Sequence, residues 1–351
     1  MRLDDLVEAI RAAQDGATPL RLRGGGSKDF YGGMLAGDVL DVAPYRGIVA
    51  YEPSELYITA RCGTPLAEIE SVLAERGQML AFEPPHFAGA TLGGCVAAGL
   101  AGPRRQQAGG VRDFMLGVKL IDGCGQVLDF GGQVMKNVAG YDVSRLLAGS
   151  LGTLGLLAQV SLKVLPRPLA EATLQFEMDE GEAIARLNAW GAQPLPLSAS
   201  FWSAGRLSLR LSGARAAVET ACLKLGGEVL EAADSHWRSV REQTHPAFAG
   251  AVLWRLSLPS TAAPLCIDGL CALEWGGAQR WYADTAAAGG LREAARQAGG
   301  HAVLYRAPES MRCLEGAFAP LAPAVLALHR RLKKGFDPQG IFNPGRMYAE
   351  L

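Results

Sequence analysis

The chain has 351 residues, of which 49% are hydrophobic and 20% charged, a composition typical of a folded protein of about two domains and not of a disordered chain. The formal net charge is −1, so binding to nucleic acid by neutralisation of phosphates has no support. The seven cysteines stand singly with no C-x-x-C pair, which argues against a protein-bound zinc or iron–sulfur centre, and no metal site is expected.

The first half of the chain alternates helix and strand patterns. Apolar residues at helical spacing predict a helix over 4–14, and alternation predicts a strand over Leu20–Arg23. Further strands are predicted at 40–42, 48–51 and 56–60, followed by a helix that Thr64 and Pro65 begin and Gly77 ends. The turn at 122–125 predicts a hairpin of 116–121 and 126–130, and a short helix at 142–147 precedes a long strand at 154–164.

Three glycine-rich stretches separate these elements. They are Arg23-Gly24-Gly25-Gly26-Ser27, then Thr91-Leu92-Gly93-Gly94 continuing to Gly99 and Gly102, and Gly149-Ser150-Leu151-Gly152-Thr153-Leu154-Gly155. Glycine lets backbone N–H groups approach a ligand, and successive N–H groups in a turn bind an anion such as phosphate. None has the spacing of a Rossmann fingerprint or a P-loop. Any one could be a plain tight turn, but three favour an extended ligand threaded between backbone segments.

The second half differs in pattern. Pro166-Arg167-Pro168 predicts a boundary between a first domain at 1–167 and a small α+β domain at 168–318. In the latter, strands predicted at 173–178, 207–211, 252–258 and 281–282 alternate with helices at 181–190, 214–225 and 291–298. An antiparallel sheet is favoured, although a parallel order also fits this alternation. A last helix over 323–336 begins a segment, 319–351, that we expect to return to the first domain.

Together these segments resemble the FAD-binding domain of the vanillyl-alcohol oxidase family over about residues 18–167 and the C-terminal tail. The resemblance implies an α+β fold, with a PCMH-type FAD-binding domain of two subdomains and a small α+β cap domain. It also implies that the first glycine loop wraps the FAD pyrophosphate, that the second lies along the pyrophosphate, ribityl chain and isoalloxazine, and that the third holds the adenine end. The cofactor-binding residues implied are Arg23, Gly24, Gly25, Gly26, Ser27, Lys28, Pro84, Pro85, Thr91, Leu92, Gly93, Gly94, Ala98, Gly99, Gly149, Ser150, Gly152, Thr153, Leu154, Gly155 and Asn343.

Noncovalent binding of FAD is expected. Relatives with covalently bound flavin place a histidine within the pyrophosphate loop, where this chain has Gly26, Ser27 and Lys28. His86 and Cys95 are the only nearby alternatives for an attachment point. Replacing Gly25 with valine is expected to abolish FAD retention, since the backbone there must approach a phosphate.

Longer strings narrow the resemblance to the small FAD-binding subunits of bacterial glycolate dehydrogenase complexes. They are Pro84-Pro85-His86, Gly99-Leu100-Ala101-Gly102-Pro103-Arg104-Arg105, 134–142 and Phe342-Asn343-Pro344-Gly345-Arg346-Met347-Tyr348. This resemblance implies oxidation of glycolate, a 2-hydroxyacid, to glyoxylate, together with a second, catalytic FAD-containing subunit and an iron–sulfur subunit.

The cell compartment follows from cysteine use and hydropathy. An odd number of cysteines without a secretory leader predicts reduced thiols and a cytoplasmic protein. The most apolar stretch, 146–165, contains glycines and a lysine and alternates as strands do, so it does not read as a membrane helix. Any membrane association is expected to be peripheral, through partners, and the 49% of apolar residues favours an obligate hetero-complex.

Catalytic residues are not assigned by the sequence. The larger relatives carry a His-Gly-Asp-Gly-Asn-type metal and substrate motif, and the nearest feature here is Gly299-Gly300-His301. His301 is the one candidate for a base that accepts the C2-hydroxyl proton, a packing role being the alternative. Arg104, Arg105 and Arg112 are candidates for binding an anion, a solvated surface cluster being the alternative. Trp254, Arg255, Trp275 and Trp281 could line a pocket, with core packing as the alternative. Lys136, Asn137, Tyr141 and Asp142 fit helix capping and a subunit contact.

Two functions therefore stay open. The chain could meet the hydroxyacid with its own flavin, or it could be a noncatalytic subunit that relays electrons or acts as a scaffold. The short second domain and the missing histidine–aspartate motif favour the second.

Overall fold

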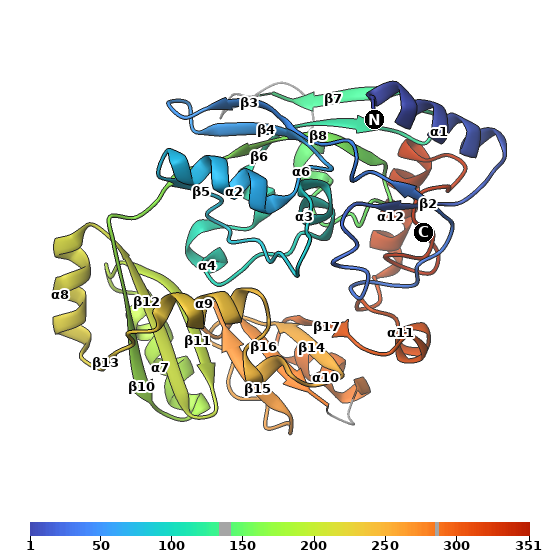
Figure 1. The fold of residues 1–351 in the computed structure, drawn as a ribbon. Coiled ribbons are helices and arrows are strands. Elements are labelled where there is room, and N and C mark those ends of the chain that lie inside the picture. The colour runs from blue at the N-terminus through green and yellow to red at the C-terminus, as the bar shows by residue number, and fades with distance from the viewer. Residues whose placement is uncertain (133–141, 285–287) are drawn as a thin grey trace.

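The computed structural model describes residues 1–132, 142–284 and 288–351, and it folds into two lobes (Figure 1). In these residues the strands form two main sheets, of five and eight strands. The mixed, mainly antiparallel arrangement confirms the α+β class predicted from the sequence. The string at 134–142, with Lys136, Asn137 and Tyr141, lies outside the described residues except for Asp142. The Asp142 side chain caps the short helix α6 (Val143–Leu146) by accepting from Arg145 N.

The first lobe is built on the five-stranded sheet, in the order β3 (Ile48–Glu52), β4 (Tyr57–Arg61), β8 (Leu156–Lys163), β6 (Met115–Ile121), β7 (Val127–Gly131). Each strand pairs antiparallel with its neighbours, and β6 and β7 form the predicted hairpin. Two small ladders flank this sheet: the parallel pair β1 (Leu20–Arg23) and β2 (Asp38–Asp41), and the antiparallel pair β5 (Gln78–Met79) and β9 (Leu165–Pro166).

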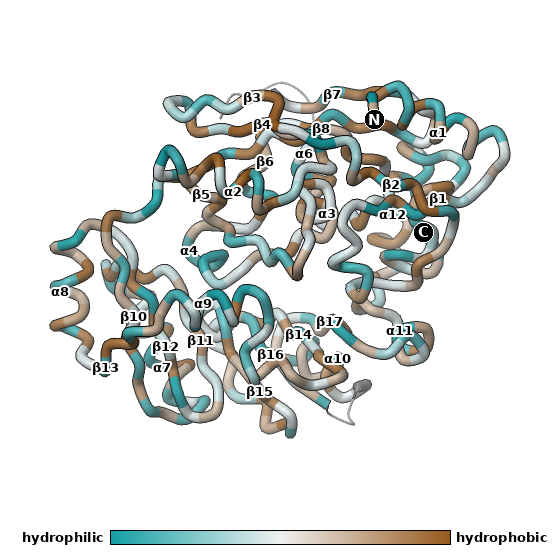
Figure 2. The backbone as a smooth tube through the Cα atoms, in the orientation of Figure 1, coloured by the Kyte–Doolittle hydropathy of each residue, from teal (hydrophilic) through white to brown (hydrophobic). Residues whose placement is uncertain are grey.

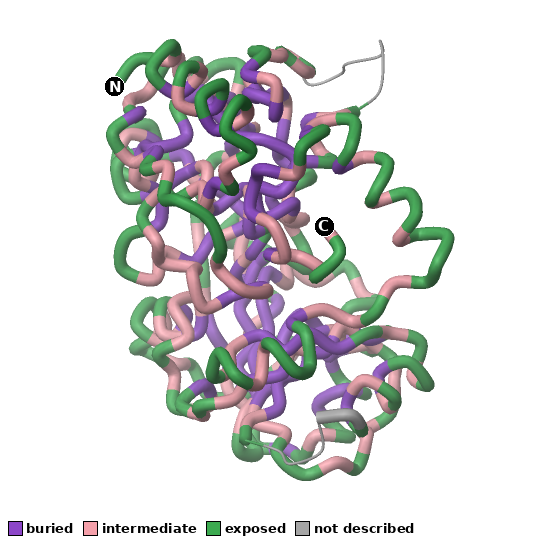
Figure 3. Tube along the Cα trace, turned by 90° about the vertical axis from the view of Figure 1, so that its right-hand side faces the viewer, coloured by how far each residue is buried: buried purple, intermediate pink, exposed green. Residues whose placement is uncertain are grey.

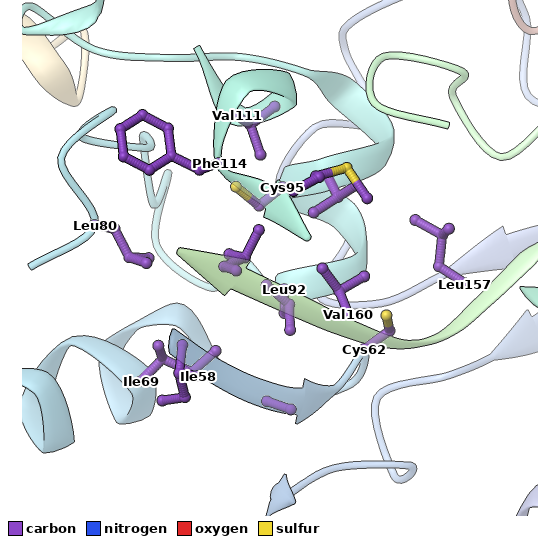
Figure 4. Close-up of a cluster of buried hydrophobic side chains, with 14 of the residues drawn as sticks. Ile58, Cys62, Ile69, Leu80, Leu92, Cys95, Val111, Phe114, Leu157 and Val160 are labelled. Atoms are coloured by element: carbon purple, nitrogen blue, oxygen red, sulfur yellow. The ribbon is translucent and has the colours of Figure 1, made fainter. Parts of the chain in front are cut away.

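Two helices, α2 (Leu66–Glu75) and α3 (Leu92–Ala98), supply the core against this sheet. Ile69 of α2 and Leu92 and Cys95 of α3 pack with Ile58 and Val160 of the strands (Figure 4). The short helices α4 (Arg105–Ala108) and α5 (Val111–Phe114) follow, and α1 (Leu3–Asp15) packs in a separate cluster with the end of the chain. The helix predicted to begin at Pro65 begins one residue later, with Pro65 at the N-cap and no side-chain capping bond.

The second lobe is an antiparallel sheet in the order β13 (Glu228–Val229), β10 (Ala170–Glu177), β12 (Arg206–Gly213), β11 (Leu197–Ser203), β15 (Leu270–Glu274), β16 (Gln279–Ala283), β14 (Leu253–Ser257), β17 (His301–Arg306). Antiparallel pairing confirms the order favoured from the sequence. Helices α7 (Glu180–Gly191), α8 (Arg215–Leu225) and α10 (Ala288–Gln297) pack on one face. The strands β11, β15 and β17 and the helix α9 (Ala233–Arg241) were not predicted from the sequence.

The other face of this sheet lies against the first lobe. Trp281 and Tyr305 from the sheet, Trp237 from α9, and Tyr31 and Leu151 from the first lobe belong to one buried cluster. Buried residues accordingly continue from one lobe into the other (Figure 3), while hydrophilic residues recur along the chain of both lobes (Figure 2). The chain crosses between the lobes where β9 ends at Pro166 and β10 begins at Ala170. Two helices, α11 (Glu309–Glu315) and the longer α12 (Pro323–Phe336), then lead back to the first lobe, as expected for the tail.

A buried ion pair fixes this returning segment. Lys333, near the end of α12, donates to Asp337 (2.8 Å) and to the carbonyl oxygens of Thr153 (2.8 Å) and Phe342 (2.7 Å). Asp337, whose side chain is fully buried, also accepts from the backbone N–H groups of Ile341 and Phe342. All the donors and acceptors of the pair are thus used, which offsets the cost of burying both charges.

We expect Lys333→Met to destabilise the protein by about 3–5 kcal/mol, because it leaves the Asp337 carboxylate buried without its cation. Urea denaturation at neutral pH measures the change. Lys334→Met is the matched control, since the neighbouring Lys334 is exposed, and it should change stability little. Equal stability of the two variants would show that the ion pair does not hold the C-terminal segment.

Candidate functional site

The three glycine-rich stretches meet in one place. Two adjoining pockets of the first lobe share Leu22, Arg23, Gly24, Thr91, Gly94, Ala97, Leu151 and Asn343 as lining residues. One extends along 25–29 to Arg346, and the other extends past Val42 and Cys62 to Gly152, Gly155 and Leu157. Because they share so much of their lining, they form one extended groove, here called the glycine groove.

Helix α3 forms one wall of the groove. Its first turn is capped by Thr91, whose hydroxyl accepts from Gly94 N (3.4 Å). A Cβ on Gly93 would lie 2.8 Å from the Cβ of Cys62, so a side chain there is excluded by the core behind the helix. A Cβ on Gly94 would meet only the Thr91 hydroxyl, at 3.4 Å. The open side of Gly94 therefore faces the groove, where a ligand can contact the backbone.

The first loop lies across the segment that precedes α3. A Cβ on Gly25 would overlap the carbonyl oxygen of Gly89, and one on Gly24 would overlap the Thr91 hydroxyl. Glycine is thus required at Gly25 by the protein's own backbone, irrespective of any ligand. This changes the interpretation of Gly25→Val, because loss of a ligand in that variant would also follow from displacement of the loop.

Asn343 connects the loops. Its side-chain oxygen accepts from Leu22 N (2.8 Å) and its amide nitrogen donates to Leu151 O (2.7 Å), while its backbone N–H donates to Leu20 O (2.8 Å). It adopts a φ of 42°, in the left-handed region that asparagine tolerates better than most residues. One side chain thereby ties strand β1 to the third glycine stretch.

Cationic side chains surround the first loop. Arg346 donates to the backbone oxygens of Gly33 (2.5 Å), Lys28 (3.0 Å) and Asp29 (3.2 Å), and burial lowers its pKa to about 10. Burial also lowers the pKa of Lys28, although Cys95 and Glu242 act in the opposite direction. Among the described residues Lys28 has no carboxylate within 4 Å, so its ammonium group is available to an anion in the groove.

The structure divides the predicted cofactor residues into two sets. Those that line the groove are Arg23, Gly24, Gly25, Gly26, Ser27, Lys28, Thr91, Gly93, Gly94, Ala98, Gly152, Gly155 and Asn343. Gly149, Ser150, Thr153 and Leu154 instead line a separate pocket beside α12. Pro84, Pro85, Leu92 and Gly99 lie outside both groove pockets, and the Leu92 side chain is in the core. Direct contact of any of them with a cofactor stays a prediction.

Several groove residues were missed from the sequence. Leu22, Val42, Cys62, Ala97 and Leu157 are apolar, and nothing in their local pattern distinguishes a groove wall from a core. For Arg346 a signal existed, since it lies within the tail string that begins at Phe342 and contains Asn343. The two alternatives for covalent attachment are not in the groove lining: the His86 ring is 3.2 Å from Glu70, and the Cys95 thiol is buried in the core.

The predicted arginine cluster separates into three environments. Arg104 is buried and pairs with Glu83 (3.4 Å) and Glu171 (2.6 Å). Glu83 also pairs with Arg210 of the second lobe (2.9 Å); burial raises its pKa, but these arginines lower it overall. This cluster joins the lobes. Arg105 instead lies over the ring of Trp275 (4.4 Å), and Arg112 is exposed.

A polar row crosses the second-lobe sheet on the face directed at the first lobe. Strand register places Glu274 opposite Gln279, Gln279 opposite Ser257, and Ser257 opposite His301. Arg255 is in the adjacent row, opposite Trp281. His301 therefore shares a face with other polar groups, with its side chain exposed, and Trp254 is on the opposite face in the core.

Glu274 carries the carboxyl group of this row, and its pKa is shifted. Burial raises its pKa to about 7, against the opposing effects of hydrogen bonds from Trp281 (2.6 Å) and Gln279 (2.8 Å) and the charge of Arg255. In the described residues no cluster of side chains could hold a metal ion, and no helix is long and apolar enough to span a membrane.

Glu274→Gln should make the stability less dependent on pH. An unfolded glutamate loses its proton near pH 4.3, whereas the folded protein keeps it to about pH 7, so the parent loses stability as pH rises through this window. Glutamine has no proton to release, and the variant should gain about 2–3 kcal/mol relative to the parent between pH 4.5 and pH 8. Denaturation curves at both pH values measure this gain. A constant difference between variant and parent would mean that Glu274 titrates normally.

Comparison with known proteins agrees with the groove. Residues 2–131 match the family model of the FAD binding domain, and residues 320–347 match that of the C-terminal domain of FAD linked oxidases. The structure of an alkyldihydroxyacetonephosphate synthase superimposes with a TM-score of 0.66 at 14% identity, covering 97% of this chain and 74% of the other. The fold is thus the FAD-binding fold with a cap domain that the sequence predicts.

Two relatives indicate the family. Glycolate oxidase subunit GlcD of Bacillus subtilis (strain 168) is 27% identical over 186 residues, which are 52% of this chain and 39% of the relative. Glycolate oxidase subunit GlcE of Escherichia coli (strain K12) is 49% identical over 348 residues, which are 99% of this chain and 97% of the relative. The chain therefore belongs to the family of glycolate oxidase subunit GlcE and carries the FAD binding domain of FAD linked oxidases.

Proposed function

We propose that this chain is the FAD-binding subunit of a complex that oxidises glycolate or a related small 2-hydroxyacid. The observation that carries the proposal is the glycine groove in a chain 49% identical to a glycolate oxidase subunit. As the resemblance to glycolate dehydrogenase complexes implies, the complex would contain a second FAD-containing catalytic subunit and an iron–sulfur subunit. The described part of this chain has no cysteine cluster for electron transfer, which agrees with that division of labour. We place it in the cytoplasm, attached to the membrane peripherally at most.

The residues of the groove fit an extended dinucleotide bound without a covalent bond. The N–H groups of 24–28 and the Lys28 ammonium would hold the pyrophosphate, which needs donors and positive charge. The apolar part between Val42, Cys62 and Leu157 would hold the adenine end. The uncovered side of Gly94 would let the cofactor lie directly on α3.

When bound, FAD accepts the hydride that a 2-hydroxyacid loses from C2, and the protein has to bind the acid, exclude water and accept the hydroxyl proton. His301 stays the candidate for the base. Although the residue as a whole is exposed, partial burial of its ring and, next, the charge of Arg255 lower its pKa, so the ring is neutral near pH 7 and able to take a proton. Its position in the polar row facing the first lobe supports this role.

A noncatalytic subunit that relays electrons or serves as a scaffold is the alternative. The exposure of His301, and the lack of a metal-binding cluster in the described residues, favour it. The two functions differ in whether the hydroxyacid reduces this chain's own flavin.

Gly94→Val tests the groove without disturbing the empty protein. Its Cβ would meet only Thr91, and valine is at least as favourable as glycine in a helix, so we expect unchanged or slightly higher stability of the FAD-free form. The added methyl groups would occupy the place of the cofactor, and FAD content should fall to less than about one tenth of the parent. The absorbance ratio at 450 and 280 nm measures it.

Gly191→Val is the control for this variant, because Gly191 is an exposed residue at the end of α7 with no atom near its Cβ position. It should keep its FAD. A Gly94→Val protein with a normal FAD content would overturn the assignment of the glycine groove to the cofactor.

A further inference from the structure

Two arginines, one from each lobe, are presented at the junction between the lobes. Arg105, on α4 of the first lobe, lies over the ring of Trp275 at 4.4 Å. Arg255, on β14 of the second lobe, lies 5.3 Å from the ring of Tyr305 and donates to the Tyr31 hydroxyl (3.2 Å). Flat guanidinium groups stacked on aromatic rings are held in place while their N–H edges stay free for a ligand.

These arginines differ from three other arginines at the junction. Arg104, Arg210 and Arg241 each have a carboxylate within 4 Å. In the part of the chain that the structure describes, neither Arg105 nor Arg255 forms such a pair, and the buried Nε of Arg255 makes no hydrogen bond. Burial and, next, the charge of Arg255 lower the pKa of Arg105, against the smaller opposing effect of the Asp113 carboxylate, so the two cations act on each other. Unpaired neighbouring cations are unfavourable unless an anion binds them.

We propose that Arg105 and Arg255 together bind the carboxylate of a small 2-hydroxyacid. A carboxylate matches the planar edge of a guanidinium with two parallel hydrogen bonds. The substrate class rests on the proposed function, whereas the anion site itself rests on the two unpaired cations.

The surroundings of the pair suit the rest of such a molecule. Ser257 and His301 lie on the same face as Arg255, in the next row of the sheet, and can meet a C2 hydroxyl. Ala98, at the end of α3, lines the glycine groove and also packs in the cluster with Trp281 and Tyr305. Arg255 stacks on Tyr305 of this same cluster, so one arginine of the pair borders the cluster that the end of the groove enters.

Calorimetric titration of the FAD-loaded protein with oxalate tests the proposal. Oxalate has the carboxylate but no C2 hydrogen to lose, so the measurement reports binding and not turnover. We expect Arg105→Gln and Arg255→Met each to weaken oxalate binding at least tenfold, with FAD content equal to the parent. Arg255→Lys keeps the charge but not the planar fork, and should bind with intermediate affinity.

Arg238→Met is the matched control. Arg238 is an exposed arginine of α9 that lines the other pocket between the lobes, with Glu70, Glu171 and Trp237. Three outcomes would each overturn the arginine site. Arg105→Gln and Arg255→Met could bind oxalate as the parent does, only Arg238→Met could lose binding, or the parent itself could fail to bind oxalate. Loss of FAD from the arginine variants would overturn it too, because these residues would then hold cofactor phosphate. A parent that holds no FAD would instead contradict the proposed function, and titration of that FAD-free parent would still decide on the anion site.

Discussion

The side chain of Asn343 is the contact on which the groove depends. It bonds both to Leu22, at the strand leading into the first glycine loop, and to Leu151, in the third stretch. Its own position is set by the Lys333–Asp337 pair, which holds the preceding turn through Ile341 and Phe342. The last thirty residues therefore help to position a site formed mainly by the first 160. In Figure 1 this C-terminal segment, which belongs to neither main sheet, runs from the second lobe back to the first.

The junction between the lobes combines two kinds of contact with different consequences. The aromatic cluster around Tyr31, Trp281 and Tyr305 excludes water from its centre. The Glu83–Arg104–Arg210 cluster, in contrast, consists of fully paired charges, and leaving one unpaired would cost several times what an exposed pair contributes. The paired arginines hold the lobes together, whereas Arg105 and Arg255 lie nearby without carboxylates. This difference, and not the number of arginines, distinguishes a structural cluster from a candidate binding site.

Much of the fold followed from local pattern. The hairpin at 115–131, the final helix at 323–336 and the chain's return to the first lobe are strongly periodic or clearly bounded, so their sequence suffices. Strands β11, β15 and β17 were missed because most of their side chains are buried or half-buried on both faces, which removes the alternation. The glycine loops were found, but sequence could not show that Gly25 is required by a backbone contact with Gly89, or that Gly94 alone is open to the groove. Nor could it place Arg105 beside Trp275, 170 residues later in the chain.

The most direct test of the central claim, that a hydroxyacid is oxidised at this chain's own flavin, is anaerobic mixing of the isolated, FAD-loaded chain with glycolate. Ala98 and Leu151 of the groove also pack in the cluster between the lobes, and Arg255 and His301 share the sheet face that carries this cluster. We therefore predict loss of flavin absorbance at 450 nm without any partner subunit. Dithionite serves as the control for a flavin that can be reduced. A flavin that dithionite bleaches and glycolate leaves oxidised would contradict the claim, and would assign the chain to electron relay or to a scaffold.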